Sequence, residues 1–192
     1  MDVSTELQLW GGIECTRNRV DSIYFDQLQM SDHRYRITDL DEIANLKIRT
    51  LRYPVLWESA APNHAAHIDW RWVDERLGYL RKLEICPIVG LVHHGSGPRY
   101  TNLLDDAFAT GLASFSLRLA RRFPWVEYYT PVNEPLTTAR FSALYGHWYP
   151  HAKTALTFAS AILNQCRATV LSMQAIRSIR PSAKLVQTED LG

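Results

Sequence analysis

The stretch WVEYYTPVNEP, residues 125–135, decides the fold of this chain. Val126, Tyr128 and Thr130 occupy alternate positions, which is the period-two pattern of a β-strand. Pro131 has no backbone N–H to donate, so we expect regular strand pairing to weaken there. The stretch is therefore predicted to begin as a strand and to leave the sheet at its end.

Asn133 and Glu134 come where this predicted strand leaves the sheet. Pro135 favours an extended backbone at Glu134 over a helical one. A carboxyl group fixed at the carboxyl end of a strand, beside an amide, suits acid/base chemistry. The alternative is a capped strand end with a solvated glutamate, and spacing alone does not separate the two interpretations.

Length and composition bound the class of protein. The 192 residues are enough for a buried core, so one domain over residues 1–192 is expected. The formal net charge is +1 and the basic residues are dispersed, which argues against a nucleic-acid partner. No apolar run approaches membrane-spanning length, and the polar start is not a signal peptide. Cys15, Cys86 and Cys166 are widely spaced and predict reduced, buried thiols in a cytoplasmic protein.

The rest of the chain alternates apolar strands with helices. Strands are predicted to begin near residues 8, 48, 85, 126 and 184, each separated from the next by a helix. Two irregular segments are predicted in addition, a long loop with a short helix at 20–37 and a long loop at 136–153. In two of the helices the apolar residues recur at helical spacing, namely Val73, Leu77 and Leu80, and Phe108, Leu112, Phe115 and Leu119. Strict alternation of this kind predicts an α/β fold with a parallel sheet.

Polar and aromatic residues collect after every predicted strand: Glu14, Arg52 with Trp57, His93, Asn133 with Glu134, and Glu189 with Asp190. This one-sided distribution is typical of the catalytic face of a (β/α)8 or TIM barrel. A doubly wound fold also places ligands at strand ends, but the chain has no Gly-x-Gly-x-x-Gly and no Walker motif. Arg52 lies inside a buried strand, so an acidic partner is expected for it.

At these residues the sequence resembles the family 1 glycoside hydrolases, the β-glucosidase type. The segment TPVNEP at 130–135 is similar to the family's Asn-Glu-Pro segment at the end of strand four. The resemblance implies that Glu134 is the general acid/base and that Asn133 hydrogen-bonds the 2-hydroxyl of the sugar. The substrate it implies is a carbohydrate or glycoside.

Two further strand ends carry the same resemblance. LRYPVLW at 51–57 is similar to the second strand, whose arginine lies beside the nucleophile, here Arg52. LVHH at 91–94 is similar to the third strand, whose first histidine contacts the sugar, here His93. A hydrogen-bonded core histidine is the alternative for His93.

Four aromatic residues are candidates for stacking on a sugar ring: Trp57, Tyr145, Trp148 and Tyr149. Of these, Trp57 and Trp148 are predicted to bind substrate. The alternative for each is packing beneath the loops, since aromatic side chains mostly serve burial.

The chain departs from the family pattern in two ways. The family's sugar-binding glutamine of strand one is not clearly present, because Gly12 or Glu14 stands there. The family nucleophile is a glutamate at the end of strand seven, whereas a full barrel needs ~250 residues. We therefore expect an incomplete barrel, about strands 1–5 with their helices, whose last strand has an unpaired edge. Self-association or a C-terminal complementing segment is expected to cover it.

The predicted function is retaining hydrolysis of O-glycosidic bonds, with the nucleophile beyond the end of this chain. Glu189 or Asp190 is disfavoured as a substitute, because the family geometry places the nucleophile across the barrel. The alternative is a catalytically silent sugar-binding or accessory barrel domain attached to a sugar-nucleotide enzyme. No cofactor is expected, and no metal either, because adjacent strand residues such as His93 and His94 point to opposite faces.

Overall fold

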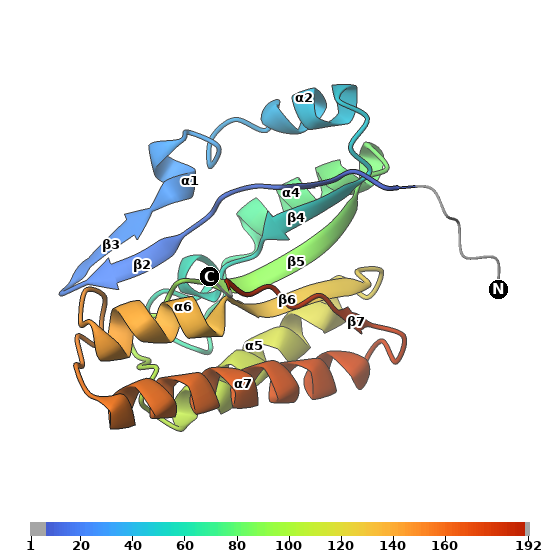
Figure 1. Ribbon diagram of the computed structural model, residues 1–192. Helices are drawn as coiled ribbons and strands as arrows, with labels where there is room; N and C mark the ends of the chain where they lie inside the picture. Colours follow the sequence, from blue (N-terminus) through green and yellow to red (C-terminus); the bar gives the residue numbers. More distant parts are fainter. Residues whose placement is uncertain (1–6, 191–192) are drawn as a thin grey trace.

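A computed structural model gives the fold, and it describes residues 7–190 (Figure 1). Five parallel strands form one sheet in the order β1–β4–β5–β6–β7. Their bounds are β1 Trp10–Gly12, β4 Thr50–Pro54, β5 Cys86–His93, β6 Tyr128–Asn133 and β7 Lys184–Leu185. All five predicted strands are present, which confirms the α/β class and part of a TIM-type barrel.

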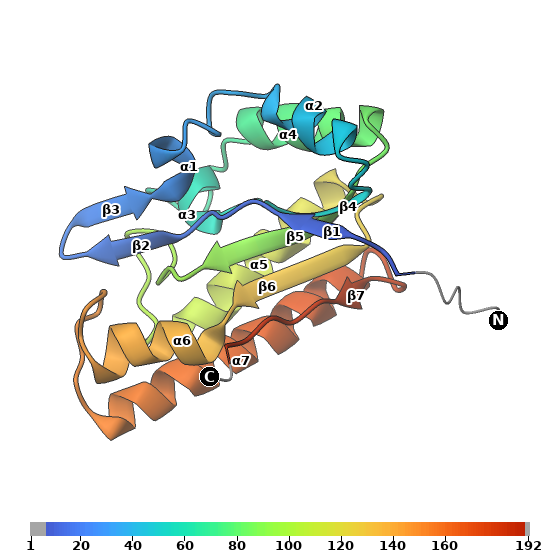
Figure 2. The same cartoon turned by 45° about the horizontal axis from the view of Figure 1, so that its top comes forward.

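Four helices of seven residues or more connect these strands: α2 Asp39–Asn45, α4 Arg71–Lys82, α5 Ala107–Arg122 and α7 Ala155–Arg177. Figures 1 and 2 show α5 and α7 running side by side along the sheet. Three short helices, α1 Gln27–Met30, α3 Trp57–Ala60 and α6 Pro135–Ala139, lie in the connections. Each connection returns the chain from the end of one strand to the start of the next, so all five strands end at the same edge of the sheet.

The core lies between the sheet and its helices. The predicted stripes are buried as expected: Val73, Leu77 and Leu80 on α4, and Phe108, Leu112, Phe115 and Leu119 on α5. They pack with apolar strand residues such as Val89, Leu91 and Val132. Burial of these apolar surfaces is the main stabilising term of the fold.

The pairing of β5 with β6 is interrupted at Pro131, as the sequence predicts. Paired positions run from Ile88–Tyr128 to His93–Asn133, and the step at Pro131 is missing. Proline has no N–H to donate to the neighbouring strand. The strand nevertheless continues to Asn133, which brings the end of β6 level with the end of β5.

The two predicted irregular segments are wrong in part, because α1 is the short helix expected in 20–37 but both segments contain further regular structure. Residues 20–37 contain most of an antiparallel hairpin, β2 Arg17–Val20 with β3 Ile23–Asp26, before α1. Asp21 turns the chain there with φ of 51°, a conformation that aspartate tolerates better than most residues. The predicted loop at 136–153 begins with α6 and a π-helical turn, η1 Arg140–Leu144. Irregular structure begins only after η1, in the part that contains Gly146 and Pro150.

The strands β1 and β7 form the two edges of the sheet within the described range. Near the β7 edge, the outer face of α7 exposes Leu156, Leu163 and Val170, spaced seven residues apart. Cys166 is also exposed, so the prediction of buried thiols is wrong for it, whereas Cys15 is buried. Although α7 is long, neither it nor another helix in residues 7–190 has the length and apolar character needed to cross a membrane.

Candidate active site

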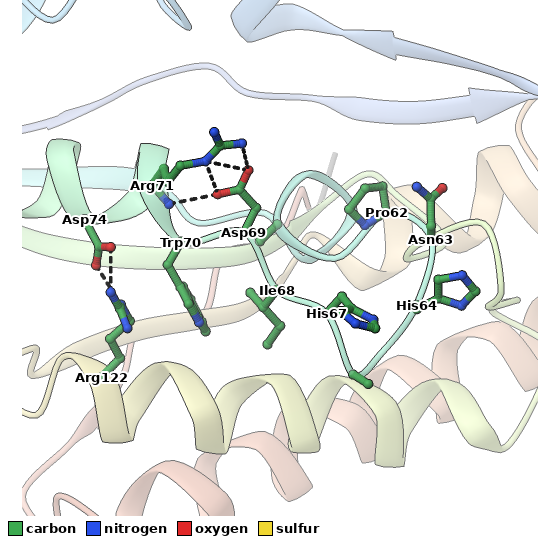
Figure 3. Close-up of a pocket in the computed structure, with 12 residues that line it drawn as sticks. Pro62, Asn63, His64, His67, Ile68, Asp69, Trp70, Arg71, Asp74 and Arg122 are labelled. Carbon is green, nitrogen blue, oxygen red and sulfur yellow. Dashed lines mark hydrogen bonds and ion pairs between the residues drawn. The ribbon is translucent and has the colours of Figure 1, made fainter.

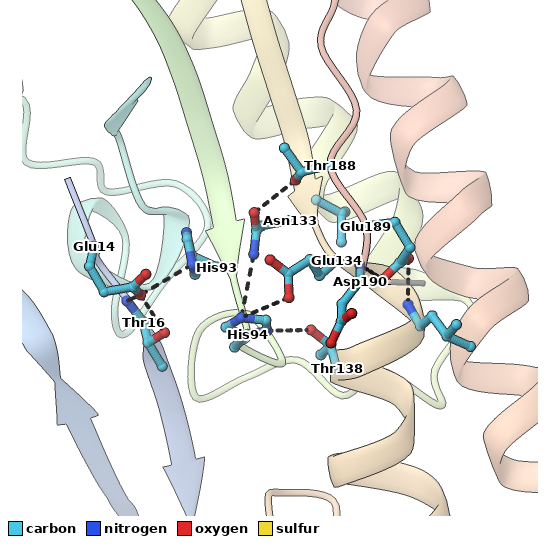
Figure 4. A network of polar contacts seen from close by, with 12 residues as sticks. Glu14, Thr16, His93, His94, Asn133, Glu134, Thr138, Thr188, Glu189 and Asp190 are labelled. Atoms are coloured by element: carbon cyan, nitrogen blue, oxygen red, sulfur yellow. Dashed lines mark hydrogen bonds and ion pairs between the residues drawn. The ribbon is translucent and has the colours of Figure 1, made fainter. Parts of the chain in front are cut away.

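The structure brings most of the predicted site residues together at the carboxyl ends of the strands (Figure 4). Asn133 at the end of β6 is paired in register with His93 at the end of β5. Arg52 on β4 reaches the same place from the next strand. Glu134 follows Asn133 directly. This convergence follows from the parallel sheet, because neighbouring strands end at one edge.

Asn133 is the centre of the hydrogen-bond network. Its side chain is buried, and its Oδ1 accepts from Arg52 Nη1 at 2.6 Å and from Thr188 Oγ1 at 2.8 Å. Its Nδ2 lies 3.4 Å from His94 Nε2. Because two donors occupy the amide oxygen, the orientation of the amide is fixed with its NH2 group toward His94. A fixed amide of this kind presents a hydrogen-bond donor at the carboxyl end of β6.

Arg52 is half-buried and bonds to this amide oxygen, so the prediction of an acidic partner is wrong within residues 7–190. No ion pair joins Arg52 to a carboxylate in that range. A half-buried guanidinium without a counter-charge favours the approach of an anion.

Glu134 has an unusual backbone for its position. Its φ of 45° and ψ of 67° are left-handed, so the predicted extended geometry is wrong. The chain must turn from β6 into α6 within one residue: the Glu134 N–H donates to Thr188 O at 3.3 Å, and its carbonyl accepts from Thr138 N at 3.0 Å. Such a backbone costs roughly 1–3 kcal/mol and is common at functional sites.

The turn at Glu134 directs its carboxyl group toward His94. The distance from Glu134 Oε2 to His94 Nε2 is 3.5 Å, and the Glu134 side chain is 26% exposed. The carboxyl group is thus open to a ligand from one side and in contact with an imidazole on the other (Figure 4). This arrangement allows a proton to be given to, or taken from, a bound molecule.

His94 also belongs to the site, a residue for which the sequence predicts no role. Its φ of 58° turns it back after β5, and its ring centroid lies 4.9 Å from that of His93. The expectation that the two histidines face opposite sides is therefore wrong. His94 Nδ1 lies 3.1 Å from Thr138 Oγ1, and burial lowers the pKa of His94. A neutral His94 can donate to Thr138 and accept from the Asn133 amide.

His93 is buried between two side chains of the segment after β1. Its Nδ1 lies 3.1 Å from Cys15 Sγ, and its Nε2 lies 3.3 Å from Glu14 Oε1. Burial and the neighbouring His94 lower the pKa of His93 to about 4. The pKa of Glu14 is lowered because hydrogen bonds from Thr16 and the attraction of His93 outweigh burial. His93 is thus neutral near pH 7, which suits a hydrogen-bonding role.

The two predicted tryptophans differ in accessibility. Trp148 is half-buried, its ring centroid lies 5.5 Å from His94, and it stacks on Phe141 at 4.7 Å. Trp57 is 1% exposed and packs against Phe108 and Phe115 in the core. No face of Trp57 is free for a sugar, so packing is its role.

Glu189 is held by the start of α6. Its Oε2 accepts from Leu136 N at 2.9 Å, while Thr188 beside it contacts Asn133. A helix amide fixes this carboxylate, so Glu189 is not simply solvated. Figure 4 shows Glu189 and Asp190 on the same side of the network as Glu134.

A separate cavity of about 700 Å³ lies beside α4 and α5 (Figure 3). None of the residues that line it belongs to the strand-end network. Its charged groups are paired with each other, Asp69 with Arg71 and Asp74 with Arg122. Exposed ion pairs of this kind contribute little and leave no charge for a ligand, so the strand ends remain the candidate active site.

Comparison with known proteins shows likeness at the level of the fold. No family model and no curated protein matches the sequence. A family 1 β-glucosidase from Thermotoga maritima in complex with isofagomine lactam superposes with a TM-score of 0.75 at 20% identity, over 84% of this chain and 38% of that chain. The β-glucosidase from the same organism in complex with glucoimidazole gives 0.71 at 20% identity, over 80% and 37%.

This chain therefore spans less than two fifths of the length of these structural neighbours. At such identity the likeness establishes the fold, a partial TIM barrel, and leaves the chemistry to the residues of the site.

Proposed function

We propose that this chain carries the acid/base half of a retaining glycoside hydrolase site of the β-glucosidase type. Glu134 is the general acid/base, and Asn133 donates to the hydroxyl next to the reacting carbon of the sugar. The observation that carries the proposal is the Asn133 amide, fixed by Arg52 and Thr188, directly beside the half-open Glu134 carboxyl group. Retaining hydrolysis requires such a carboxyl group next to hydroxyl-binding donors.

The remaining predicted residues have roles consistent with a sugar ligand. His93 is neutral, and a sugar hydroxyl would hydrogen-bond it by taking the place of Glu14 at Nε2. Trp148 offers a partly exposed ring beside His94. The structural neighbours are described in complex with isofagomine lactam and glucoimidazole, which supports a carbohydrate as the substrate. No step of this proposal uses a cofactor.

The nucleophile is assigned to a carboxylate outside residues 7–190. Retaining enzymes hold their two carboxyl groups ~5–5.5 Å apart, so that carboxylate must approach Glu134 closely. The positive charge of Arg52 is not paired with a carboxylate in residues 7–190, so its guanidinium would keep the nucleophile ionised. The carboxylates of Glu14 and Glu189 are already engaged, by Thr16 and by the start of α6.

The β7 edge and the exposed face of α7 support a docking place for a covering segment. We propose that a further strand pairs with β7 and that its helix covers Leu156, Leu163 and Val170 of α7, whether it comes from a longer chain or from a second copy. A cytoplasmic location is part of the same proposal, supported by three free cysteines.

The test is hydrolysis of an aryl β-glucoside by the 192-residue chain, beside Glu134→Gln and the control Glu127→Gln. Glu127 precedes β6 at the opposite end of the sheet. We expect turnover only in the presence of a segment that supplies the nucleophile. Under that condition Glu134→Gln should lose turnover, and Glu127→Gln should keep it. Equal turnover by all three would refute the role of Glu134. Sugar binding without turnover under every condition would favour the silent binding domain.

A further inference from the structure

A second carboxyl group, Glu58, lies buried behind the site. It stands in the first turn of α3, directly after β4, and is 1% exposed. Its Oε1 accepts from the backbone N–H of Gly97 at 3.1 Å. Gly97 belongs to the turn of residues 94–98, which begins at His94 and which we call the His94 turn. Glu58 therefore contacts the loop that carries a residue of the site.

The His94 turn is packed against the Glu58 carboxyl group without space between them. A Cβ atom at Gly95 would collide with Glu58 Oε1, and Gly97 has φ of 76°. Glycine is needed at Gly95 for the close approach of Glu58 and at Gly97 for the positive φ. A change at the carboxyl group is therefore transmitted to the backbone of the turn.

Other hydrogen bonds hold the turn from its remaining sides. Ser96 Oγ donates to Tyr149 O at 2.7 Å, and Tyr24 Oη donates to Gly97 O at 3.1 Å. Thr101 Oγ1 donates to Ser96 O at 2.7 Å. The turn is thus held by three segments: the β2–β3 hairpin, the loop before α7 and the segment at Thr101.

The Glu58 carboxyl group is only half satisfied. Its Oε2 is buried and has no hydrogen-bond partner in residues 7–190. Arg17, whose charge acts on Glu58, is bonded to Asp26 and to Ser59. The titratable groups that face Glu58 from the surrounding segments are Cys15, Arg17, Tyr24, Asp26 and Tyr100. Burial raises the pKa of Glu58 to about 7, against the attraction of Arg17.

We propose that Glu58 is a positioning residue for the His94 turn, and that the turn changes its hydrogen bonding when Glu58 gains or loses a proton. A buried carboxyl group that loses its proton becomes a charged carboxylate, here with one oxygen that has no hydrogen-bond donor in residues 7–190. The backbone N–H of Gly97 already donates to this carboxyl group, so the turn is expected to tighten on the carboxylate. His94 moves with it, because His94 is the first residue of the turn and contacts both Glu134 and Asn133.

The test is nuclear magnetic resonance of the 192-residue chain between pH 5 and 9, which needs no turnover and so is independent of the proposed hydrolysis. The Gly97 amide and the His94 ring are expected to shift with a common midpoint near pH 7, above the titration of His94 itself. In Glu58→Gln, which keeps the acceptor oxygen, this midpoint disappears. In the control Glu127→Gln it remains.

Persistence of the midpoint in Glu58→Gln, or its absence from the natural chain, would overturn the proposal. Should Glu58→Gln not fold, the carboxyl carbon of Glu58 is followed in the natural chain. A midpoint shared with the Gly97 amide supports the proposal, and a separate midpoint near the ordinary value for glutamate overturns it.

Discussion

Replacing Glu58 by glutamine makes the stability of the fold respond differently to pH. In the folded chain the pKa of Glu58 is about 7, against 4.5 for the free side chain. A folded-state pKa above the unfolded value means that the stabilising contribution is complete below pH 4.5 and is lost as pH rises through 7. At 1.36 kcal/mol per unit of pKa, the loss is about 3 kcal/mol. Glutamine resembles the protonated form and does not titrate.

The assay is urea unfolding followed by circular dichroism at several pH values from 5 to 8.5, on the natural chain and Glu58→Gln. The quantity compared is the difference between their free energies of unfolding. We expect this difference to shift in favour of the glutamine variant by about 2.5 kcal/mol from pH 5 to 8.5, since part of the loss already occurs below pH 5. His93 titrates in the opposite sense, since its pKa is lowered to about 4, but it is present in both proteins and cancels. A difference that stays constant with pH would refute the reasoning.

The other predictions concern individual residues of the site and surface. Trp57→Ala should destabilise the fold by about 3–5 kcal/mol in the same unfolding assay, because it empties a core site. Trp148→Ala should cost under half of that and weaken sugar binding in calorimetry; equal costs for the two would contradict their assignment. Asn133→Ala should destabilise by about 1–3 kcal/mol, since Arg52 and Thr188 lose their acceptor. Unchanged stability would show that water replaces the amide. Leu163→Glu should reduce self-association in sedimentation velocity if a second copy covers α7, whereas an already monomeric natural chain would rule out a second copy as the occupant of the docking face.

Much of the fold was predictable because its signals are local. Alternation in residues 126–130 and the helical spacing of Phe108, Leu112 and Phe115 depend on sequence neighbours and on burial of one face. The hairpin β2–β3 was missed because neither strand alternates: β2 is polar at three consecutive positions, RNR, and β3 is apolar or aromatic at three consecutive positions, IYF. The segment α6–η1 was missed because Gly146 and Pro150 favour a loop, and the predicted loop was extended back over residues 136–144.

The site was predictable only in part. Parallel strands necessarily bring residues such as Asn133 and His93 to one edge, and the sequence shows which residues end each strand. The role of His94 depends on a positive φ, and that of Thr188 on contact across 55 positions, neither of which leaves a local pattern. The adjacent histidines directly after a buried strand were the available signal. Trp57 and Trp148 could not be separated, because packing and stacking select the same side chain.

The most direct test of the central claim is calorimetric binding of glucoimidazole, the ligand of one structural neighbour, to the natural chain, Glu134→Gln and Glu127→Gln. Glucoimidazole has a basic nitrogen that an acid/base carboxyl group can protonate. We predict at least tenfold weaker binding to Glu134→Gln, unchanged binding to Glu127→Gln, and glucose binding that is equal in all three. Glucoimidazole binding that is unaffected by Glu134→Gln would contradict the assignment of the acid/base.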